Sequence, residues 1–496
     1  IYVWIHLNRL SSFLGPPHTS FTSVIDQLTS LQSKKASAQQ IATLTDQDIL
    51  IRPDLENIGF VDFENANDAI PKGIEAATNI LDQLLKFKLS EDQWNVYYSS
   101  RTEVKQQLSV IDFIRVENNS DLSDEAIKSR LSLSEGQKLN TEQLSENLNE
   151  IYGLGLFEEV DYNIIKQNGN TELEVRTKQR SEGEDYIRFG LALQENFEGE
   201  SGFQLAAGFT NLAVNSYGGE WQTLINLGQE FSLFTEFYQP LDFKENFYVF
   251  TNAKGSKINR NILSDDNSGT ILSQARISLL TLQFGGGLNL GQWGTLRAGL
   301  QRSIGYVKGR IGFSADHKIA FDETSFGVEF LVDTLDNINF PTTGNSVEIS
   351  YVNNLSLLGG DGNVDTVLMG SYTPFTWGKN TLGIRTAFAT SFNGNPNETN
   401  LFPLGGFMRL TSFSPGQLTG NHGGVLTALF YRRISGGPQY LTQMPIYVGG
   451  SIESGNVWNH SEDINFNDLK WSSSLFVGID TILGPTYLGV GFGSGG

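Results

Sequence analysis

From Asp185 almost to the C-terminus, apolar residues alternate with polar or small residues at every second position. In YIRFGLALQ, for example, Ile187, Phe189 and Leu191 would lie on one face of an extended strand. The same period recurs in TSFGVEFLVD and in TLGIRTAF. A period of two is typical of a β-strand with one apolar face. The pattern predicts a mainly β fold, but single strands do not say whether this face points into a soluble sandwich or out towards lipid.

The connections between these strands favour the lipid-facing barrel. Short turns, WGKN, GQWG and LGPT, alternate with long polar segments, GSKINRNILSDDNSG, GRIGFSADHKIAFDE and NHSEDINFNDLK. Short turns at one rim and long loops at the other are typical of outer-membrane barrels. A barrel strand needs only about 9–11 residues to cross the bilayer. We therefore expect residues 184–496 to form an antiparallel transmembrane β-barrel surrounded by outer-membrane lipids.

Strand starts can be counted along this region. We expect fifteen, near Asp185, Gly202, Gly219, Glu230, Asn246, Ser273, Thr295, Thr324, Ser346, Val364, Thr381, Gly424, Ile446, Trp471 and Thr486. Bacterial single-chain barrels have even strand numbers. The sequence therefore predicts a barrel of the sixteen-stranded type, whose last strand would follow the terminal GFGSGG.

Composition excludes several classes of function. The chain has no cysteine, and its five histidines show no metal-ligand spacing, so we expect no metal site and no cofactor. The net charge of −21 argues against binding to nucleic acid, which requires basic patches.

Residues 108–180 have a different pattern, strand, helix, helix, strand and strand. Ser123 is a candidate N-cap for the first helix and Thr141 precedes the apolar face of the second, while Asn168-Gly169 is a typical hairpin turn. This βααββ module, with GLFEEVDYNI, resembles a POTRA domain. With the barrel that follows, it resembles the outer-membrane assembly-factor and surface-antigen superfamily, which pairs POTRA domains with a sixteen-stranded barrel.

One long connection, FPLGGFMRLTSFSPGQLTGNHGG, resembles the sixth extracellular loop of that superfamily, which folds back into the lumen and carries an arginine. The matching residues are Arg409, Ser412 in place of a glycine, and Phe413. SIESGNVW resembles a strand motif of the same proteins, with Glu453 and Gly455. An arginine in a partly dry lumen needs an anion, so we expect Arg409 to pair with Glu453. The alternative is an arginine solvated in a wide pore.

Residues 1–100 read as mixed α/β, with helices in FTSVIDQLTSLQSKK and FENANDAIPKGIEAATNILDQLLKF and a short strand in DILIRPDL. DILIRPDLENIGFVDFENANDAIPKGIEAA resembles the C-terminal end of a patatin-like phospholipase domain; an ordinary α/β fragment is the alternative. The catalytic motifs of that family are GxSxG and DG[GA], and no segment matches either, so no catalytic residue is assigned. The segment IYVWIHLNRL matches no pattern and is left unassigned.

The order patatin remnant, single POTRA and barrel resembles the patatin-like autotransporters of type Vd secretion. This resemblance implies the translocating and anchoring part of a Gram-negative outer-membrane phospholipase, with the POTRA domain in the periplasm and the passenger at the cell surface. The full-length protein would hydrolyse membrane phospholipid and relatives suggest a homodimer, whereas residues 1–496 are expected to be inactive. The alternatives are an assembly factor or two-partner secretion transporter without an enzyme, and a passive pore, which would need neither a POTRA domain nor the arginine loop.

Overall fold

The computed structural model describes residues 2–8, 49–51, 53–55, 69–104, 110–181, 183, 185–195, 201–263, 271–311, 318–356, 360, 364–394, 401–435, 444–481 and 484–494. The chain divides into two compact units, one with residues 1–10, 110–435 and 445–496 and the other with residues 11–109 and 436–444. Each unit is described by itself. Among the described residues, no helix is both long enough and apolar enough to cross a membrane.

The smaller unit is helical where it is described. Its elements are α2 (Ala69–Asn79), α3 (Leu81–Leu84), η2 (Leu85–Phe87) and α4 (Glu91–Val104). The helix predicted around IPKGIEAATNI is therefore present, but the strand predicted in DILIRPDL is not formed by its described residues. A strand needs a partner for its backbone groups, and no strand of this unit is described. The helix predicted in FTSVIDQLTSLQSKK lies outside the described residues.

The larger unit begins with one short strand, which belongs to the barrel, and continues with the βααββ module. The module consists of β2 (Phe113–Asn118), α5 (Asp124–Arg130), α6 (Thr141–Gly153), β3 (Phe157–Gln167) and β4 (Asn170–Gln179). The strand order is β2-β4-β3, with β4 parallel to β2 and antiparallel to β3. The predicted order of elements is confirmed. Leu144 and Ile151 of α6 are fully buried against this sheet's core, as the apolar spacing of the helix requires.

The starts of both helices agree with the sequence. The Ser123 hydroxyl accepts a hydrogen bond from the Ala126 N–H at 3.2 Å, which confirms it as the N-cap of α5. Helix α6 begins at Thr141, and its N-cap is the preceding Asn140, whose side chain accepts bonds from Glu142 N and Gln143 N. Both helix starts are therefore fixed by side-chain oxygens.

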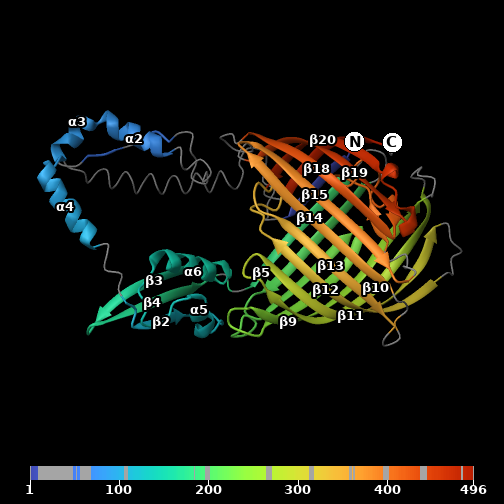
Figure 1. The fold of residues 1–496 in the computed structure, drawn as a ribbon, viewed down its shortest axis with the longest axis horizontal. Helices are drawn as coiled ribbons and strands as arrows, with labels where there is room; N and C mark the ends of the chain where they lie inside the picture. Colours follow the sequence, from blue (N-terminus) through green and yellow to red (C-terminus); the bar gives the residue numbers. More distant parts are fainter. Residues whose placement is uncertain are drawn as a thin grey trace, which may run out of the picture. The chain divides into compact units, whose positions relative to one another are not determined.

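The rest of the larger unit is a large antiparallel sheet in which each strand pairs with the next along the chain (Figure 1). Its strands are β5 (Asp185–Glu195), β6 (Ser201–Asn211), β7 (Glu220–Gly228), β8 (Glu230–Pro240), β9 (Phe247–Leu263), β10 (Ile271–Asn289), β11 (Gly294–Ile311), β12 (Lys318–Asp333), β13 (Ser346–Leu355), β14 (Asp365–Trp377), β15 (Asn380–Phe392), β18 (His422–Ser435), β19 (Ile446–Trp458), β20 (Lys470–Thr481) and β21 (Gly484–Gly493). Each of the fifteen predicted strands is present.

The sixteenth place in the strand order is taken by the N-terminal segment. Strand β1 (Tyr2–Asn8) pairs antiparallel with β21 on one side and with β5 on the other, so that the order of strands closes. The strand count predicts the sixteenth strand after the C-terminal GFGSGG and leaves this segment unassigned. Its period-two sequence, YVWIHLN, suits a strand, and two unpaired sheet edges are a strong template for one.

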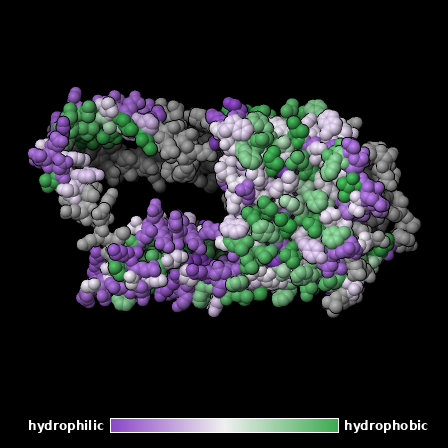
Figure 2. All heavy atoms as spheres, viewed as in Figure 1, coloured by the Kyte–Doolittle hydropathy of each residue, from purple (hydrophilic) through white to green (hydrophobic). Residues whose placement is uncertain are grey.

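The apolar face of the sheet is its outer face. Ile187, Phe284 and Leu475 are each 63–64% exposed, and many other apolar residues at alternate positions are exposed with them. Figure 2 shows these apolar side chains gathered over the barrel strands. A soluble sandwich would bury such a face. The exposed apolar residues therefore exclude the soluble sandwich that the sequence left open.

The inner face of the wall carries polar side chains, which form a ladder across strands β7 to β10. The Gln222 amide donates to Glu236 at 3.0 Å, and the Asn252 amide donates both to Glu236 at 3.1 Å and to Gln283 at 2.9 Å. The neighbour Phe284 points outwards, so Gln283 points into the lumen. We call these four residues the polar ladder.

The loops differ from the expected ones in part. Gly378-Lys379 and residues 290–293 are short turns at one rim, as predicted. Two of the predicted long loops are instead largely strand, because β9, β10, β11 and β12 are 16–19 residues long and continue through the polar segments. Polar residues continue a strand wherever the neighbouring strand supplies backbone partners, which hydropathy does not reveal.

Two further connections contain structure of their own. The loop between β15 and β18 holds a small hairpin, β16 (Phe402–Leu404) and β17 (Leu418–Gly420). The loop between β19 and β20 holds η6 (Ser461–Asp463) and η7 (Phe466–Asp468).

Candidate functional site

The connection between β15 and β18, which we call the lumen loop, packs against the inner face of the barrel wall with its described residues 401–421. Its apolar residues bury one another and reach the wall, in a cluster of Phe402, Leu404, Leu410, Phe413 and Leu418 with Ala389 and Val425. The small hairpin holds the two ends of the loop together, so that its tip, residues 405–416, projects as a unit.

The tip is held by the carboxylate of Glu453 on β19. Glu453 is completely buried, whereas its neighbour Ile452 is 71% exposed on the outer face, so the carboxylate points into the lumen. It accepts bonds from the Thr411 backbone N–H and from the Thr411 hydroxyl, both at 2.6 Å. The Ser451 hydroxyl donates to the same carboxylate. Charge-assisted bonds of this kind are the stronger class of hydrogen bond, so Thr411 is the anchor of the loop.

The predicted pair between Arg409 and Glu453 is not formed. The Arg409 guanidinium is exposed, donates to the Pro403 carbonyl at 3.0 Å and lies 5.9 Å from the centre of the Phe402 ring. The reason is the backbone, because Met408 and Leu410 have φ angles of 60° and 70°. These left-handed residues are buried and turn Arg409 away from the wall. The solvated alternative describes this arginine better.

Ser412 lies where the superfamily has glycine, and its backbone does not need glycine's freedom, since it is not among the residues with positive φ. Its hydroxyl is 2.7 Å from the Ser472 hydroxyl of β20. The space comes from glycines on the facing strand: a Cβ added at Gly493 of β21 would lie 2.9 Å from Ser412 Cβ, and one at Gly491 would lie 2.6 Å from Thr411 Cγ2. Serine in place of glycine at position 412 is therefore accommodated by a hydrogen bond to Ser472 and by the small residues of the facing strand.

The other two predicted residues have structural roles at the same place. Phe413 is buried in the loop's apolar cluster, and the Lys470 ammonium lies 5.6 Å from the centre of its ring. Gly455 lies on β19 against β18, where a Cβ would collide with the Gly424 carbonyl. Only glycine fits this close backbone approach.

The loop tip thus contacts four consecutive strands. In addition to Glu453 on β19, Ser472 on β20 and Gly491 on β21, the Thr427 hydroxyl of β18 donates to the Met408 carbonyl at 3.1 Å. The structure therefore brings Arg409, Ser412, Phe413 and Glu453 into one region, but through Thr411, which the sequence did not single out.

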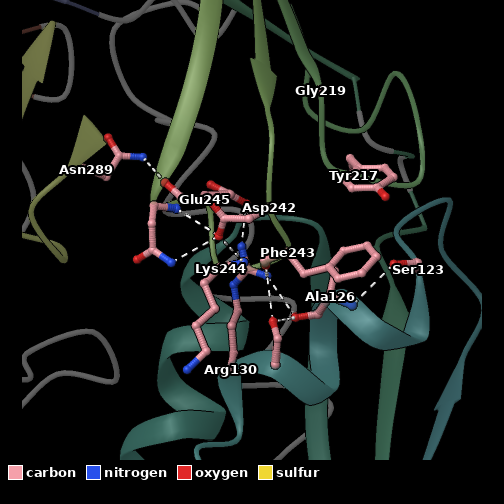
Figure 3. A network of polar contacts seen from close by, with 12 residues as sticks. Ser123, Ala126, Arg130, Tyr217, Gly219, Asp242, Phe243, Lys244, Glu245 and Asn289 are labelled. Atoms are coloured by element: carbon pink, nitrogen blue, oxygen red, sulfur yellow. Dashed lines mark hydrogen bonds and ion pairs between the residues drawn. The ribbon is translucent and has the colours of Figure 1, made fainter. Parts of the chain in front are cut away.

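A second polar site joins the βααββ module to the barrel (Figure 3). Arg130, near the end of α5, is 5% exposed and donates to the Phe243 carbonyl at 2.6 Å and to the Glu245 carboxylate. Phe243 and Glu245 lie in the turn 241–246 between β8 and β9. We call the Arg130–Glu245 pair, with its carbonyl contacts, the latch.

The turn is shaped so that it presents Glu245 to the helix. The Asp242 carboxylate accepts bonds from the N–H groups of Lys244, Asn246 and Phe247. Although burial alone would raise it, these N–H bonds hold the pKa of Asp242 below its usual value. Glu245 has a φ of 57°, a conformation that favours glycine.

Burial acts differently on the other carboxylate of this turn. Desolvation raises the pKa of Glu245, and the opposing attraction of Arg130 does not fully offset it. A strained and desolvated glutamate costs free energy. Glu245 therefore does not stabilise the turn in which it lies. It provides the specific contact with Arg130 of the βααββ module.

Two neighbouring contacts complete this interface. The Ser123 N–H donates to the Ser216 carbonyl of the turn between β6 and β7 at 3.0 Å. Tyr217 of the same turn stacks on Phe243 with ring centres 4.7 Å apart. The module is therefore held by two turns at one rim of the barrel, the rim that also carries the short turns.

The sequence gives no signal for the latch, because Arg130 and Glu245 are 115 residues apart and each is an ordinary charged residue of its segment. Thr411 could have been noticed only as a neighbour of Arg409. Within the described ranges, no cluster of three or more His, Cys, Asp or Glu residues could hold a metal ion.

With this geometry established, comparisons place the chain among known proteins. Residues 109–180 match the POTRA family, described as a surface antigen variable number repeat. The predicted module spans 108–180. No curated protein sequence matches this chain. The chain therefore carries a POTRA domain followed by a large antiparallel β-sheet.

Solved structures share this architecture. BamA from Haemophilus ducreyi lacking POTRA domains 1–3 is similar with a TM-score of 0.61 and 14% identity, over 77% of this chain and 81% of that one. CdiB from Escherichia coli is similar with a TM-score of 0.51 and 15% identity, over 96% of this chain and 100% of that one. CdiB from Acinetobacter baumannii has a TM-score of 0.50 and 11% identity, over 96% and 100%. At these identities, the likeness is one of fold.

Proposed function

We propose that the chain is the translocating and anchoring unit of a Gram-negative outer-membrane protein. The observation that carries this proposal is the outward apolar face of the barrel. Soluble proteins rarely expose so large a continuous apolar surface to water. Strands β5–β15 and β18–β21 are 9–19 residues long and β1 has 7, against the roughly 9–11 that a tilted strand needs to cross the bilayer. The barrel would lie in the outer membrane, with its outer face against lipid.

The exposed tryptophans support this placement. Trp221, Trp293 and Trp377 lie at the rim that carries the POTRA contacts, and Trp471 lies at the start of β20 near the other rim; each is 47–55% exposed. Aromatic residues at both rims are typical of membrane barrels, where they occupy the two water interfaces. The POTRA-side rim would face the periplasm.

Translocation is the function that the POTRA domain supports best. Its sheet has the order β2-β4-β3, so that β2 and β3 are edges. An extended polypeptide can add to such an edge through main-chain hydrogen bonds. The latch holds this domain at the mouth of the barrel, where it would receive a segment on its way to the lumen.

The passenger is proposed to be a patatin-like phospholipase. The support is the resemblance of DILIRPDLENIGFVDFENANDAIPKGIEAA to the end of such a domain, together with the order of the parts. On the same basis the natural protein would act on membrane phospholipid at the cell surface and would form a homodimer. Residues 1–496 contain no GxSxG motif, so the proposal assigns no nucleophile among them.

The second candidate is an assembly factor or a two-partner secretion transporter without an enzyme. The similarity in fold to BamA and to the two CdiB proteins supports it equally well. It predicts further POTRA domains ahead of residue 110 in the natural protein and no serine hydrolase.

Two measurements test these proposals on the natural protein in Gram-negative outer membranes. Heat-modifiable migration and resistance to carbonate extraction are expected for a membrane barrel, and a protein released by carbonate would refute the anchoring role. A fluorophosphonate probe should then label the natural protein, while the 496-residue chain, which lacks GxSxG, serves as the unlabelled control. A natural protein that is inserted but never labelled supports the transporter without an enzyme.

A further inference from the structure

The connection between β12 and β13, residues 334–345, is a folded element and not a simple turn. The Asp336 carboxylate accepts bonds from the N–H groups of Thr342 and Thr343, at 2.7 and 3.0 Å, and from the Thr342 hydroxyl. Its base is closed by a bond from the Thr334 N–H to the Asn345 carbonyl at 2.9 Å. We call this element the inner strap. Its internal bonds allow it to move as one piece.

The inner strap reaches into the lumen and inserts one aromatic side chain. Phe340 is 2% exposed and stacks on Tyr447 of β19 with ring centres 3.9 Å apart. It also meets Tyr431 of β18 edge to face at 5.7 Å and lies 5.4 Å from Tyr487 of β21. Its neighbour Ile338 is 84% exposed, so the insertion of Phe340 is selective.

Polar bonds fix the strap on the same wall. The Asn339 amide donates to the Asp480 carboxylate of β20 at 2.8 Å, and the Tyr431 hydroxyl donates to the Pro341 carbonyl. In the order of strands, β14 and β15 lie between the strap's own strand β13 and β18. The strap therefore runs along the inner wall past β14, where the Thr376 hydroxyl donates to the Thr342 carbonyl at 2.7 Å, and reaches β18–β21, the four strands that also hold the lumen loop.

The inner strap and the lumen loop meet there. Phe340 and Met408 belong to one buried cluster, and both line a cavity of about 330 Å³ with the charged side chains of Arg385 and Glu348. The strap lies at the rim that carries the POTRA contacts, because β12 runs towards that rim in the antiparallel order. It therefore covers the inner wall of β18–β21 on the side from which a periplasmic segment would enter.

We propose that the inner strap is a gate for an extended polypeptide, with Phe340 as its plug. The gate rests on the proposed translocating function, since only a barrel that conducts a chain needs a removable closure. Opening requires the strap to swing as a unit, which releases Phe340 from the three tyrosines and breaks the bond between Asn339 and Asp480. The cavity beneath Phe340 is the space that becomes continuous with the entrance.

Conductance of the purified full chain in planar lipid bilayers tests the gate. Phe340→Ala should raise the open probability about tenfold or more, because two or three aromatic contacts are lost from the closed state only. Phe340→Leu, which keeps apolar volume but not ring stacking, should give a smaller increase. Phe375→Ala is the matched control, since Phe375 is 54% exposed on the outer face, and it should leave the open probability unchanged.

A reversible cross-link supplies an independent readout. The chain has no cysteine, so the double variant Asn339→Cys with Asp480→Cys offers two unique thiols. A short bifunctional methanethiosulfonate should abolish openings, and a reductant should restore them. Openings that persist when the strap is cross-linked, or a Phe340→Ala variant that conducts like Phe375→Ala, would overturn the gate.

The two proposals fail in different ways. If neither the unaltered chain nor any variant inserts and conducts, the translocating barrel itself is wrong, and the gate is wrong with it. If the unaltered chain conducts but the strap variants do not change the openings, only the gate is wrong.

Discussion

Replacing Arg130 by alanine should loosen the POTRA domain from the barrel. The change leaves the Glu245 carboxylate and the Phe243 carbonyl without their donor in a largely desolvated place. Removing one partner of a fully buried ion pair costs about 3–5 kcal/mol. Because 24% of the Glu245 side chain is exposed, we expect a smaller loss of docking free energy, about 2–3 kcal/mol. The cost should appear in docking, since the pair joins the POTRA domain to a barrel turn within the larger unit.

Hydrogen exchange measured by mass spectrometry on the detergent-solubilised chain is the appropriate assay. Amides of α5 that open by undocking should exchange roughly 30- to 150-fold faster, the factor that corresponds to this free energy. Arg115→Ala is the matched control, because Arg115 lies in the same domain and is paired with Glu172 and Glu174, but 58% of its side chain is exposed. An exposed pair contributes less than about 1 kcal/mol.

The pattern of exchange decides between docking and folding. The reasoning is refuted if Arg130→Ala accelerates exchange in α5 no more than Arg115→Ala does. It is refuted equally if α6, which takes no part in the latch, exchanges as fast as α5, since the whole domain would then have unfolded. A second variant, Glu245→Gly, removes the carboxylate but relieves the positive φ, so it should loosen docking by about 1 kcal/mol less than Glu245→Ala.

Three further outcomes are expected. Glu453→Ala should raise the rate of trypsin cleavage in the lumen loop about tenfold or more, through loss of charge-assisted bonds; an unchanged rate would show that the loop is held elsewhere. Gly491→Val should destabilise the barrel in heat-modifiability gels by about 1–3 kcal/mol through overpacking, whereas Gly370→Ala, which has open space around it, should not. Because its folded pKa is raised, Glu245 opposes folding as the pH rises through its folded value, whereas the stability from Asp242, with a lowered pKa, is lost as the pH falls through its own. Carboxyl NMR should find Glu245 titrating above exposed glutamates and Asp242 below exposed aspartates, and the opposite order would contradict the burial and bonding described.

Local patterns predict most of the fold. The strands are found because a period of two is written in consecutive residues, and the βααββ module because caps and turns such as Ser123 and Asn168-Gly169 are local signals. The place of β1 could not be predicted, since it depends on two sheet edges that close only in three dimensions.

The candidate site is predicted in outline but not in its bonds. The loop, Glu453 and Gly455 are identified from motifs, yet Glu453 is paired with Arg409 because an arginine in a partly dry lumen needs an anion. The left-handed backbone at Met408 and Leu410 turns Thr411, and not Arg409, towards the wall. A methionine or leucine in the sequence gives no indication that its φ is positive.

The polar ladder has a consequence for the other side of the lumen. The lumen loop and the inner strap both occupy β18–β21, and the ladder lies on β7–β10. Amide and carboxylate groups there bond to one another much as water molecules do, and a passing backbone could exchange partners with them one at a time. If the barrel translocates an unfolded segment, the segment would form transient hydrogen bonds with the polar ladder. The aromatic residues on the opposite side offer no such partners. Under the proposed translocating function, the two sides of the lumen would therefore differ in how they treat a passing segment.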